Sequence, residues 1–358
     1  MHKGQRRDLM TKMKERKTDH IEICLNKRIS PDYCYWDDIK LIHEALPEVD
    51  LDEIDTSARV LGKKLDFPFI VTAITGGFSG AKKINSNLAE ACAELGIGMG
   101  VGSQRAALEN VDKESYAVVK EYDVPLVIGN LGAPQFVKQK GKNVYDEGSV
   151  DAARELIDAD VVAIHLNFLQ EIVQPEGDTK AKGCYDAIKD IARRSPIIVK
   201  ETGAGISGRT IDRLKGIGIK GIDIAGMGGT SFSAVELYRA ESVNDEIRTA
   251  IGKTFFDWGI PSPVSLMNAE DSGMQIIASG GIRTGLHVAN SIALGACCGG
   301  AANLLLKEAS ESADAVKRKL TIIKEELKAA MFLTGSSDIS ELGSAEHIIT
   351  GKTKEWMG

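Results

Sequence analysis

Residues 275–285 have the sequence QIIASGGIRTG, and this stretch decides the fold. A short apolar run leads directly into a double glycine and then into a segment with helical character. Strands that are buried on both faces of a parallel sheet form continuous apolar runs. Glycine tolerates positive φ and lets a ligand approach the backbone closely. The stretch therefore indicates a buried parallel strand whose carboxyl end opens onto a helix.

Seven other short apolar or small-residue runs are spread along the chain, and several of them are continuous. In order, the eight runs are residues 67–74, 97–101, 125–129, 161–167, 196–200, 221–225, 275–279 and 296–300. Helical patterns lie between them, for example at residues 84–95, 150–157 and 211–214. Repeated strand–helix units of this kind predict the α/β class and one (β/α)8 TIM barrel. A doubly wound sheet would need fewer strands and a GxGxxG motif after its first strand, which this sequence lacks.

The barrel is expected to span residues 67–335 as one domain. Residues 1–66 form an N-terminal extension, which starts with a charged amphipathic helix at about residues 11–25. An insertion separates strands six and seven, and residues 336–358 form a C-terminal tail.

The composition argues against several classes of function. The formal net charge is −7, so an anion site must be a local feature, and nucleic acid is not an expected partner. No apolar stretch reaches the ~18 residues of a membrane span, and no signal peptide is evident. We expect a soluble cytoplasmic protein with no membrane partner, whose six cysteines are reduced thiols.

In a (β/α)8 barrel the active site lies at the carboxyl ends of the strands, and phosphate sites recur after strands seven and eight. Gly280 and Gly281 follow the seventh run and precede a helix, whose amino terminus attracts anions. Ala301 and Ala302 follow the eighth run after another pair of glycines. Each double glycine alone could be a tight turn, but the pair of motifs at these positions predicts a phosphate cradle.

Other strand ends indicate a flavin-like pocket. Residues 72–75 form a polar turn along which a flat ring can lie, and Asn130 can donate and accept hydrogen bonds at a uracil-like edge. Lys200 ends an apolar run, so its charge needs an anionic partner, which a reduced flavin would supply. The alternative for Lys200 is a salt bridge to Glu201 or to a neighbouring acid.

Basic residues indicate a second anion-binding region. Arg16, Lys17 and His20 lie close together on the expected N-terminal helix, where Arg16 and His20 share one face. Taken alone, this pattern is typical of a solvated helix. Arg105 at a strand end adds a second cation, and arginine suits diphosphate recognition. His165 lies at a strand end, where it is expected to face the ligand rather than the core.

Acidic residues cluster after strand four. They are Glu171, Glu176 and Asp178. Carboxylates beside a diphosphate need a bridging cation, and Mg²⁺ usually takes one or two carboxylates together with phosphate oxygens. Glu171 is the expected Mg²⁺ ligand, whereas the segment QPEGD that contains the other two has strong turn-forming chemistry.

These residues fall within motifs that resemble those of the type 2 isopentenyl-diphosphate delta-isomerases. The resemblance runs from about residue 16 to about residue 305. It rests above all on MGVGSQR (residues 99–105) and QPEGD (residues 174–178), supported by RKTDHI (16–21), TGG (75–77), GNLG (129–132), HLN (165–167), GGTS (228–231) and DWGIP (257–261).

The resemblance implies FMN, Mg²⁺ and NADPH as the flavin reductant, and assembly as a homotetramer or homo-octamer. It places FMN at Thr72, Ala73, Ile74, Thr75, Ser103, Asn130, Lys200, Thr230, Gly280, Gly281, Arg283, Ala301 and Ala302. It places the substrate at Arg16, Lys17, Ser103, Gln104, Arg105 and Gln170, and Mg²⁺ at Glu171. His20 and His165 fall at polar positions near the diphosphate or the reacting carbons. Two residues depart from the pattern, Phe168 and Phe232, and both are expected to affect the prenyl pocket.

The predicted activity is the interconversion of isopentenyl diphosphate and dimethylallyl diphosphate, in isoprenoid biosynthesis. Moving a double bond adds one proton and removes another, so no net electrons are transferred. We expect reduced FMN, supported by Lys200, to take part in proton transfer, while His20, His165 and Gln170 act on or orient the substrate.

Three other functions share parts of this pattern. An FMN-dependent oxidoreductase of the 2-hydroxy-acid oxidase type generally has a histidine base after strand six, whereas residues 225–230 contain none. A nucleotide dehydrogenase with a catalytic cysteine loop would need a cysteine there. A non-enzymatic barrel that binds a phosphate ligand fits the spacing equally well.

Overall fold

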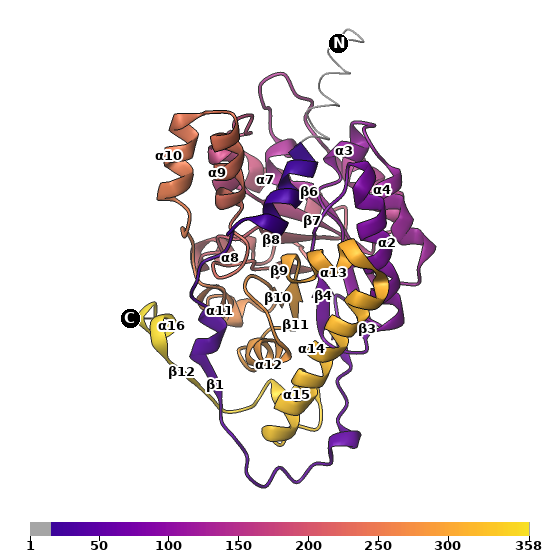
Figure 1. Ribbon diagram of the computed structural model, residues 1–358, viewed down its shortest axis with the longest axis vertical. Helices are drawn as coiled ribbons and strands as arrows, with labels where there is room; N and C mark the ends of the chain where they lie inside the picture. Colours follow the sequence, from indigo (N-terminus) through magenta and orange to yellow (C-terminus); the bar gives the residue numbers. More distant parts are fainter. Residues whose placement is uncertain (1–15, 358) are drawn as a thin grey trace.

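The computed structural model describes residues 16–357, and residues 11–15 of the predicted N-terminal helix lie outside this range. Within it, eight parallel strands form a closed barrel in the order β10-β11-β4-β5-β6-β7-β8-β9 (Figure 1). The strands are β4 (Phe69–Val71), β5 (Gly98–Gly100), β6 (Leu126–Gly132), β7 (Val161–Leu166), β8 (Ile197–Glu201), β9 (Gly221–Asp223), β10 (Gln275–Ala278) and β11 (Cys298–Ala301). The order follows the chain and closes between β11 and β4, so the predicted (β/α)8 barrel is confirmed.

Side chains along β7 alternate between the inside and the outside of the barrel. Val161 and Ala163 belong to the buried cluster inside it, whereas Val162 and Ile164 belong to the larger core that includes the surrounding helices. Continuing this period of two places His165 on the inside, next to the carboxyl end of the strand.

Asn130 and Lys200 reach the interior in the same way. Each follows an inward-facing residue by two positions, Ile128 on β6 and Ile198 on β8. β6 continues to Gly132, so Asn130 lies within the strand and not at its end as predicted. The inward alternation still directs the side chain to the cavity above the apolar layer.

A hairpin from the N-terminal extension closes the amino-terminal end of the barrel. It consists of β2 (Ala58–Val60) and β3 (Lys63–Leu65), which pair antiparallel. Leu61 and Gly62 at its turn both have positive φ, as two-residue type I′ turns require. Val60 and Leu65 are fully buried in the cluster that fills the barrel, so this end is packed with apolar side chains.

Helices surround the barrel, and loops connect them to the carboxyl ends of the strands (Figure 1). They are α2 (Ser79–Glu94), α3 (Arg105–Leu108), α4 (Glu114–Ala117), α5 (Glu147–Ile157), α6 (Phe168–Val173), α7 (Cys184–Ala192), α8 (Gly208–Leu214), α9 (Phe232–Ser242), α10 (Glu246–Thr254), α11 (Ser262–Met267), α12 (Gly285–Ala293), α13 (Leu306–Glu311), α14 (Ala313–Leu333), α15 (Ile339–Leu342) and α16 (Gly351–Glu355). Helices α9, α10 and α11 lie between β9 and β10, where the sequence predicts an insertion. None of the described helices is both long and apolar enough to cross a membrane.

The N-terminal extension and the C-terminal segment pack together. β1 (Ile39–Leu41) pairs antiparallel with β12 (His347–Ile349), and the Thr353 hydroxyl donates to Asp38 at 2.8 Å. Residues 16–26 form the N-terminal helix, drawn in indigo in Figure 1, which packs against α9. The extension therefore contacts both ends of the barrel. The domain boundaries at residues 66 and 335 stay a prediction.

Candidate active site

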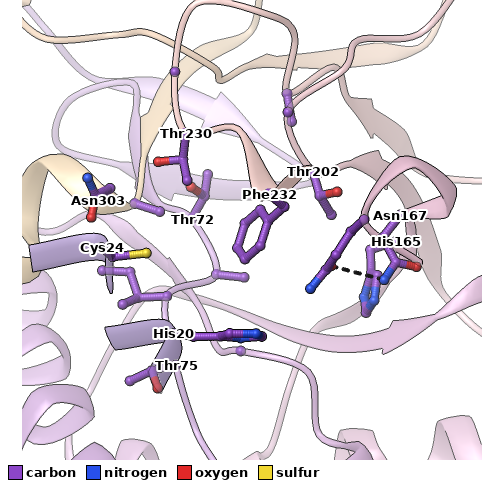
Figure 2. A pocket seen from close by; sticks show the side chains of 18 of the residues that line it. His20, Cys24, Thr72, Thr75, His165, Asn167, Thr202, Thr230, Phe232 and Asn303 are labelled. Atoms are coloured by element: carbon purple, nitrogen blue, oxygen red, sulfur yellow. Dashed lines mark hydrogen bonds between the residues drawn. The ribbon is translucent and has the colours of Figure 1, made fainter. Parts of the chain in front are cut away.

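A cavity of about 400 Å³ opens at the carboxyl ends of the strands, a volume typical of ligand sites. Figure 2 shows the rings of His20 and Phe232 in this cavity, with Thr72 on one side and His165 and Asn167 on the other. All predicted FMN residues line it, together with the other predicted catalytic and metal residues, His20, His165, Gln170 and Glu171. Among the predicted substrate residues, Arg16, Lys17, Ser103, Arg105 and Gln170 line it, whereas Gln104 does not.

Gln104 is fully buried behind the cavity wall. Its amide nitrogen donates to the Ala153 carbonyl at 2.7 Å, and its oxygen accepts from the Asn130 amide at 2.8 Å. Both ends of the side chain therefore bind backbone groups. The structure places Gln104 as a support that joins α5 to β6, away from the substrate cavity.

The predicted phosphate cradle lies at one end of the cavity. Gly280 and Gly281 have φ values of +86° and +85°, a region that L side chains rarely adopt. A β-carbon on Gly281 would come within 2.8 Å of the Gly228 carbonyl oxygen. These glycines therefore make a strained turn possible, and they also allow two backbone segments to pack at the cavity wall. The structure therefore shows the tight turn, whereas the approach of a phosphate stays a prediction.

Lys200 lies on the floor of the cavity and has protein partners. Its ammonium donates to the Glu201 carbonyl at 2.9 Å and lies 3.8 Å from the Asp223 carboxylate. Burial raises the pKa of Asp223 against the opposing effect of Lys200. The Glu201 carboxylate instead accepts from the backbone amides of residues 202–204, so the carboxylate near Lys200 is that of Asp223.

His165 is a neutral histidine with a fixed tautomer. Its Nδ1 lies 2.8 Å from the Asn130 Oδ1, and Asn130 uses its nitrogen to donate to the Val101 carbonyl. Nδ1 must therefore carry the proton and donate it to Asn130. Burial, assisted by the charges of Lys200 and Lys17, lowers the pKa of His165 to about 3. The free Nε2 is consequently an acceptor at neutral pH.

Three of the cations that line the cavity, Arg16, Lys17 and Arg105, lie close together. Arg105 bonds Glu109 at 2.9 Å and Asp178 at 3.1 Å, and Arg16 lies 3.5 Å from Glu176. Lys17 has no carboxylate within ion-pair distance in the described part of the chain. Burial lowers its pKa to about 7, with Arg16 and Arg105 adding to the effect. An anion placed here would stabilise the charged form of Lys17, so the arrangement favours binding of a phosphate group.

Glu236 on α9 organises this end of the site, and the sequence analysis missed it. It is fully buried, and one of its oxygens lies 2.9 Å from both His20 Nε2 and Gln170 Nε2. Its other oxygen accepts from Arg239 at 2.6 Å. Burial raises the pKa of Glu236, but His20 and Arg239 outweigh this effect and hold it at about 2. Glu236 thereby joins the N-terminal helix to α6.

Glu171, the predicted Mg²⁺ ligand, lies next to Asn167. Glu171 is buried and accepts from Asn167 at 2.9 Å and from the Asp178 backbone amide. Burial raises the pKa of Glu171. The Asn167 Oδ1 is buried and has no hydrogen-bond partner among the described residues, although Asn167 lines the cavity. A carboxylate beside an unpaired amide oxygen fits Mg²⁺, which prefers oxygen ligands.

The two departures from the family pattern have different positions. Phe232 lines the cavity, and its ring packs edge-on to His20 with a centroid distance of 6.3 Å. Phe168 packs against the hydrophobic core and is not among the cavity-lining residues. Only Phe232 is therefore placed to shape the pocket directly.

The barrel and the cavity at its carboxyl end define the class of protein. A family model described as "FMN-dependent dehydrogenase" matches residues 25–145 and 179–350. A mandelate oxidase with (S)-2-phenylpropionate has a similar fold, with a TM-score of 0.62 and 14% identity, over 95% of this chain and 98% of the other. A second mandelate oxidase structure, with 2-hydroxy-phenylacetamide, gives a TM-score of 0.60 and 16% identity, over 97% and 98% of the two chains.

More similar sequences have a different enzyme name. "Isopentenyl-diphosphate delta-isomerase" of Thermoplasma volcanium is 46% identical over 96% of this chain and 99% of its own length. Proteins of the same name are 45% identical in Archaeoglobus fulgidus, over 96% and 98%, and 48% identical in Methanothrix thermoacetophila, over 95% and 94%. The chain is an enzyme of the FMN-dependent dehydrogenase family and belongs to its isopentenyl-diphosphate delta-isomerase group, which confirms the family predicted from the motifs.

Proposed function

We propose that the protein interconverts isopentenyl diphosphate and dimethylallyl diphosphate with FMN and Mg²⁺. The main supporting observation is that the cavity has two separate regions suited to anions. The glycine turn with Arg283 follows β10, whereas Arg105 follows β5, and β11 and β4 separate these two strands around the barrel. Arg16 and Arg105 are close enough to Lys17 to lower its pKa, so these three cations form one group. One region suits the FMN phosphate and the other suits the diphosphate of a prenyl substrate. The names of the relatives agree with this assignment.

The residues at the basic end would hold the substrate. Arg105 offers a guanidinium for two-point contact with a phosphate, and Lys17 would gain a full charge as the anion binds. Glu171, together with Asn167 Oδ1, would hold Mg²⁺ against the diphosphate oxygens. This arrangement would fix the polar end of the substrate and leave its apolar tail beside Phe232.

The reaction itself needs one proton added to the terminal alkene carbon and another removed from the carbon on the other side of the methyl-substituted alkene carbon. Reduced FMN, when bound, would supply the chemistry for this proton transfer. Lys200 would support negative charge in the low-dielectric floor of the cavity. His165 is neutral and would offer Nε2 as an acceptor, while Glu236 would fix His20 and Gln170 beside the substrate. NADPH as the reductant, a homotetramer or homo-octamer and a cytoplasmic location belong to the same proposal.

The competing function is oxidation of a 2-hydroxy acid, as the name of the family model and the mandelate oxidase fold suggest. Against it, residues 225–230 after β9 contain no histidine. The described histidines that line the cavity, His20 and His165, come from the N-terminal helix and from β7 instead.

The deciding experiment counts product molecules per flavin. The enzyme is reduced anaerobically, excess reductant is removed, and isopentenyl diphosphate is added in deuterated water. We expect many turnovers from one reduction, with solvent deuterium in the product. One product per flavin, or NADPH oxidised in step with product, would identify an oxidoreductase and reject the proposed function.

A further inference from the structure

The carbonyl of Gly280 accepts hydrogen bonds from two side chains that lie outside the predicted phosphate cradle. The Trp36 indole N–H donates to it at 2.9 Å, and the Ser262 hydroxyl donates at 2.6 Å. The carbonyl oxygen and the following amide of a trans peptide point in opposite directions. Pinning the Gly280 oxygen therefore fixes the direction of the Gly281 N–H. No described residue accepts a hydrogen bond from that N–H, and Gly281 lines the cavity.

Trp36 belongs to the N-terminal extension, in the 3-10 helix η1 (Tyr35–Asp38). Its side chain is 1% exposed, and Asn290 of α12 donates to its backbone carbonyl at 3.0 Å. Asn290 also donates to the Ile39 carbonyl at 3.1 Å. The indole donor is thus anchored from both its backbone and its ring, as a positioning group needs to be.

A second contact from the same helix reaches the other side of the cradle. The Arg283 backbone amide donates to His287 Nδ1 at 3.2 Å, and His287 Nε2 lies 2.9 Å from Asp37 Oδ1. Burial lowers the pKa of His287, so the ring is neutral and carries one proton. Because Nδ1 accepts, Nε2 must donate to Asp37. This chain fixes the backbone from which the Arg283 side chain enters the cavity.

Cys34, Asp37 and His287 also bring a sulfur, an oxygen and a nitrogen within 4.8 Å of one another, which resembles a metal site. The tautomer of His287 argues against that role. A metal-binding histidine uses one ring nitrogen for the metal and donates a proton from the other. Here Nδ1 accepts from the Arg283 backbone N–H. If a metal bound Nε2, a protonated Nδ1 would face that N–H, so that two donors opposed each other. The alternative, an unprotonated Nδ1, would require the ring to be an imidazolate anion. The cluster is better explained as support for the Gly280–Arg283 turn.

We propose that Trp36 and the Asp37–His287 pair are positioning residues for the phosphate of the bound cofactor. The N-terminal extension would then hold the phosphate cradle as well as supply substrate-binding cations. This inference rests on the proposed binding of FMN. It extends that proposal by assigning the geometry of the cradle to residues outside the barrel.

The test uses FMN and riboflavin, which lacks the phosphate. Dissociation constants of both are measured by flavin fluorescence titration of the full-length protein freed of flavin. Trp36→Phe removes the N–H donor together with the five-membered ring that carries it, and we expect FMN to bind about tenfold more weakly, since one hydrogen bond to the cradle is lost. Riboflavin should bind to the variant and to the wild type within twofold. Trp258→Phe is the matched control, because Trp258 is 63% exposed, and it should change neither constant.

Asp37→Ala gives a second test that does not depend on core packing, because the Asp37 side chain is 66% exposed. We expect about two- to fivefold weaker FMN binding, unchanged riboflavin binding and a shifted ³¹P resonance of bound FMN. Equal weakening of both flavins, or unchanged FMN binding in both variants, would overturn the inference. If the wild-type protein bound neither flavin, the proposed function itself would fail, which is a separate result.

Discussion

Replacing Glu236 by glutamine should destabilise the protein and disconnect its N-terminal helix. Glutamine has nearly the same shape but no charge. The wild-type carboxylate is fully buried and serves His20, Gln170 and Arg239 at 2.9, 2.9 and 2.6 Å. The main interaction that the substitution removes is the ion pair between Glu236 and Arg239, whose side chain is 13% exposed. The uncharged amide leaves that guanidinium without its buried partner.

Two considerations give the same magnitude. Removing one partner of a buried ion pair typically costs about 3–5 kcal/mol. The pKa of Glu236 is held at about 2 against an ordinary value of 4.5, and at ~1.36 kcal/mol per pKa unit this corresponds to about 3 kcal/mol. We therefore expect Glu236→Gln to lower the free energy of unfolding by about 3 kcal/mol at neutral pH. That is a large share of the ~5–15 kcal/mol of a typical domain.

The pH dependence gives the sign of the effect. A carboxylate with a depressed pKa stabilises the folded state above its unfolded pKa, and this contribution is lost as the pH falls through the folded value. The stability difference between wild type and Glu236→Gln should be constant near neutral pH. It should shrink as the pH falls from about 4.5 towards about 2.

The assay is urea unfolding of wild type, Glu236→Gln and Glu176→Gln at pH 7.5, repeated at lower pH. Glu176 contacts the same Arg239 at 3.2 Å, but its side chain is 46% exposed. Such exposed pairs contribute about 0–1 kcal/mol, so Glu176→Gln is the matched control. A loss in Glu236→Gln no larger than in the control, or a difference that does not depend on pH, would refute the assignment of Glu236 as a buried charged anchor.

Other variants test the remaining parts of the site. Arg105→Ala should raise KM about 10–100-fold through loss of charged hydrogen bonds to the diphosphate, and an unchanged KM would return Arg105 to a structural role with Glu109 and Asp178. Glu171→Gln should shift the Mg²⁺ dependence of turnover to higher concentration, and an identical titration curve would exclude Glu171 as a ligand. Gly281→Val should abolish FMN retention after gel filtration, because its β-carbon would press on the Gly228 carbonyl, and full flavin content would exclude the cradle.

Local patterns in the sequence were enough to predict the barrel. Each strand is marked by its own apolar run, and the closed order follows from repeating one strand–helix unit. The same rule predicted where the site lies, because inward-facing residues at strand ends, such as His165 and Lys200, reach the cavity. The boundaries were less predictable. β6 runs two residues past Asn130, because the backbone pairing with β7 continues to Gly132 and no side-chain pattern marks its end.

Long-range partners could not be predicted in this way. Glu236 is 216 residues from His20 in sequence, and on α9 it looks like an ordinary helical glutamate. Gln104 lies in the most specific motif of the chain, beside Ser103 and Arg105, yet it faces the backbone of α5. Its neighbours line the cavity because adjacent residues of the turn point in different directions. Motif membership thus located the segment but did not separate ligand contacts from supporting contacts.

The N-terminal extension has a role that follows from its positions along the cavity. Its first helix brings Arg16 and Lys17 to the basic end, where Glu236 holds His20. Its 3-10 helix η1 then places Trp36 against the Gly280 carbonyl in the glycine turn after β10. One continuous segment therefore contacts both proposed anion-binding ends, while its hairpin packs beneath the barrel interior. A barrel that bound flavin alone would need only the cradle, so the extent of these contacts supports a site built for a cofactor and a second phosphorylated ligand together.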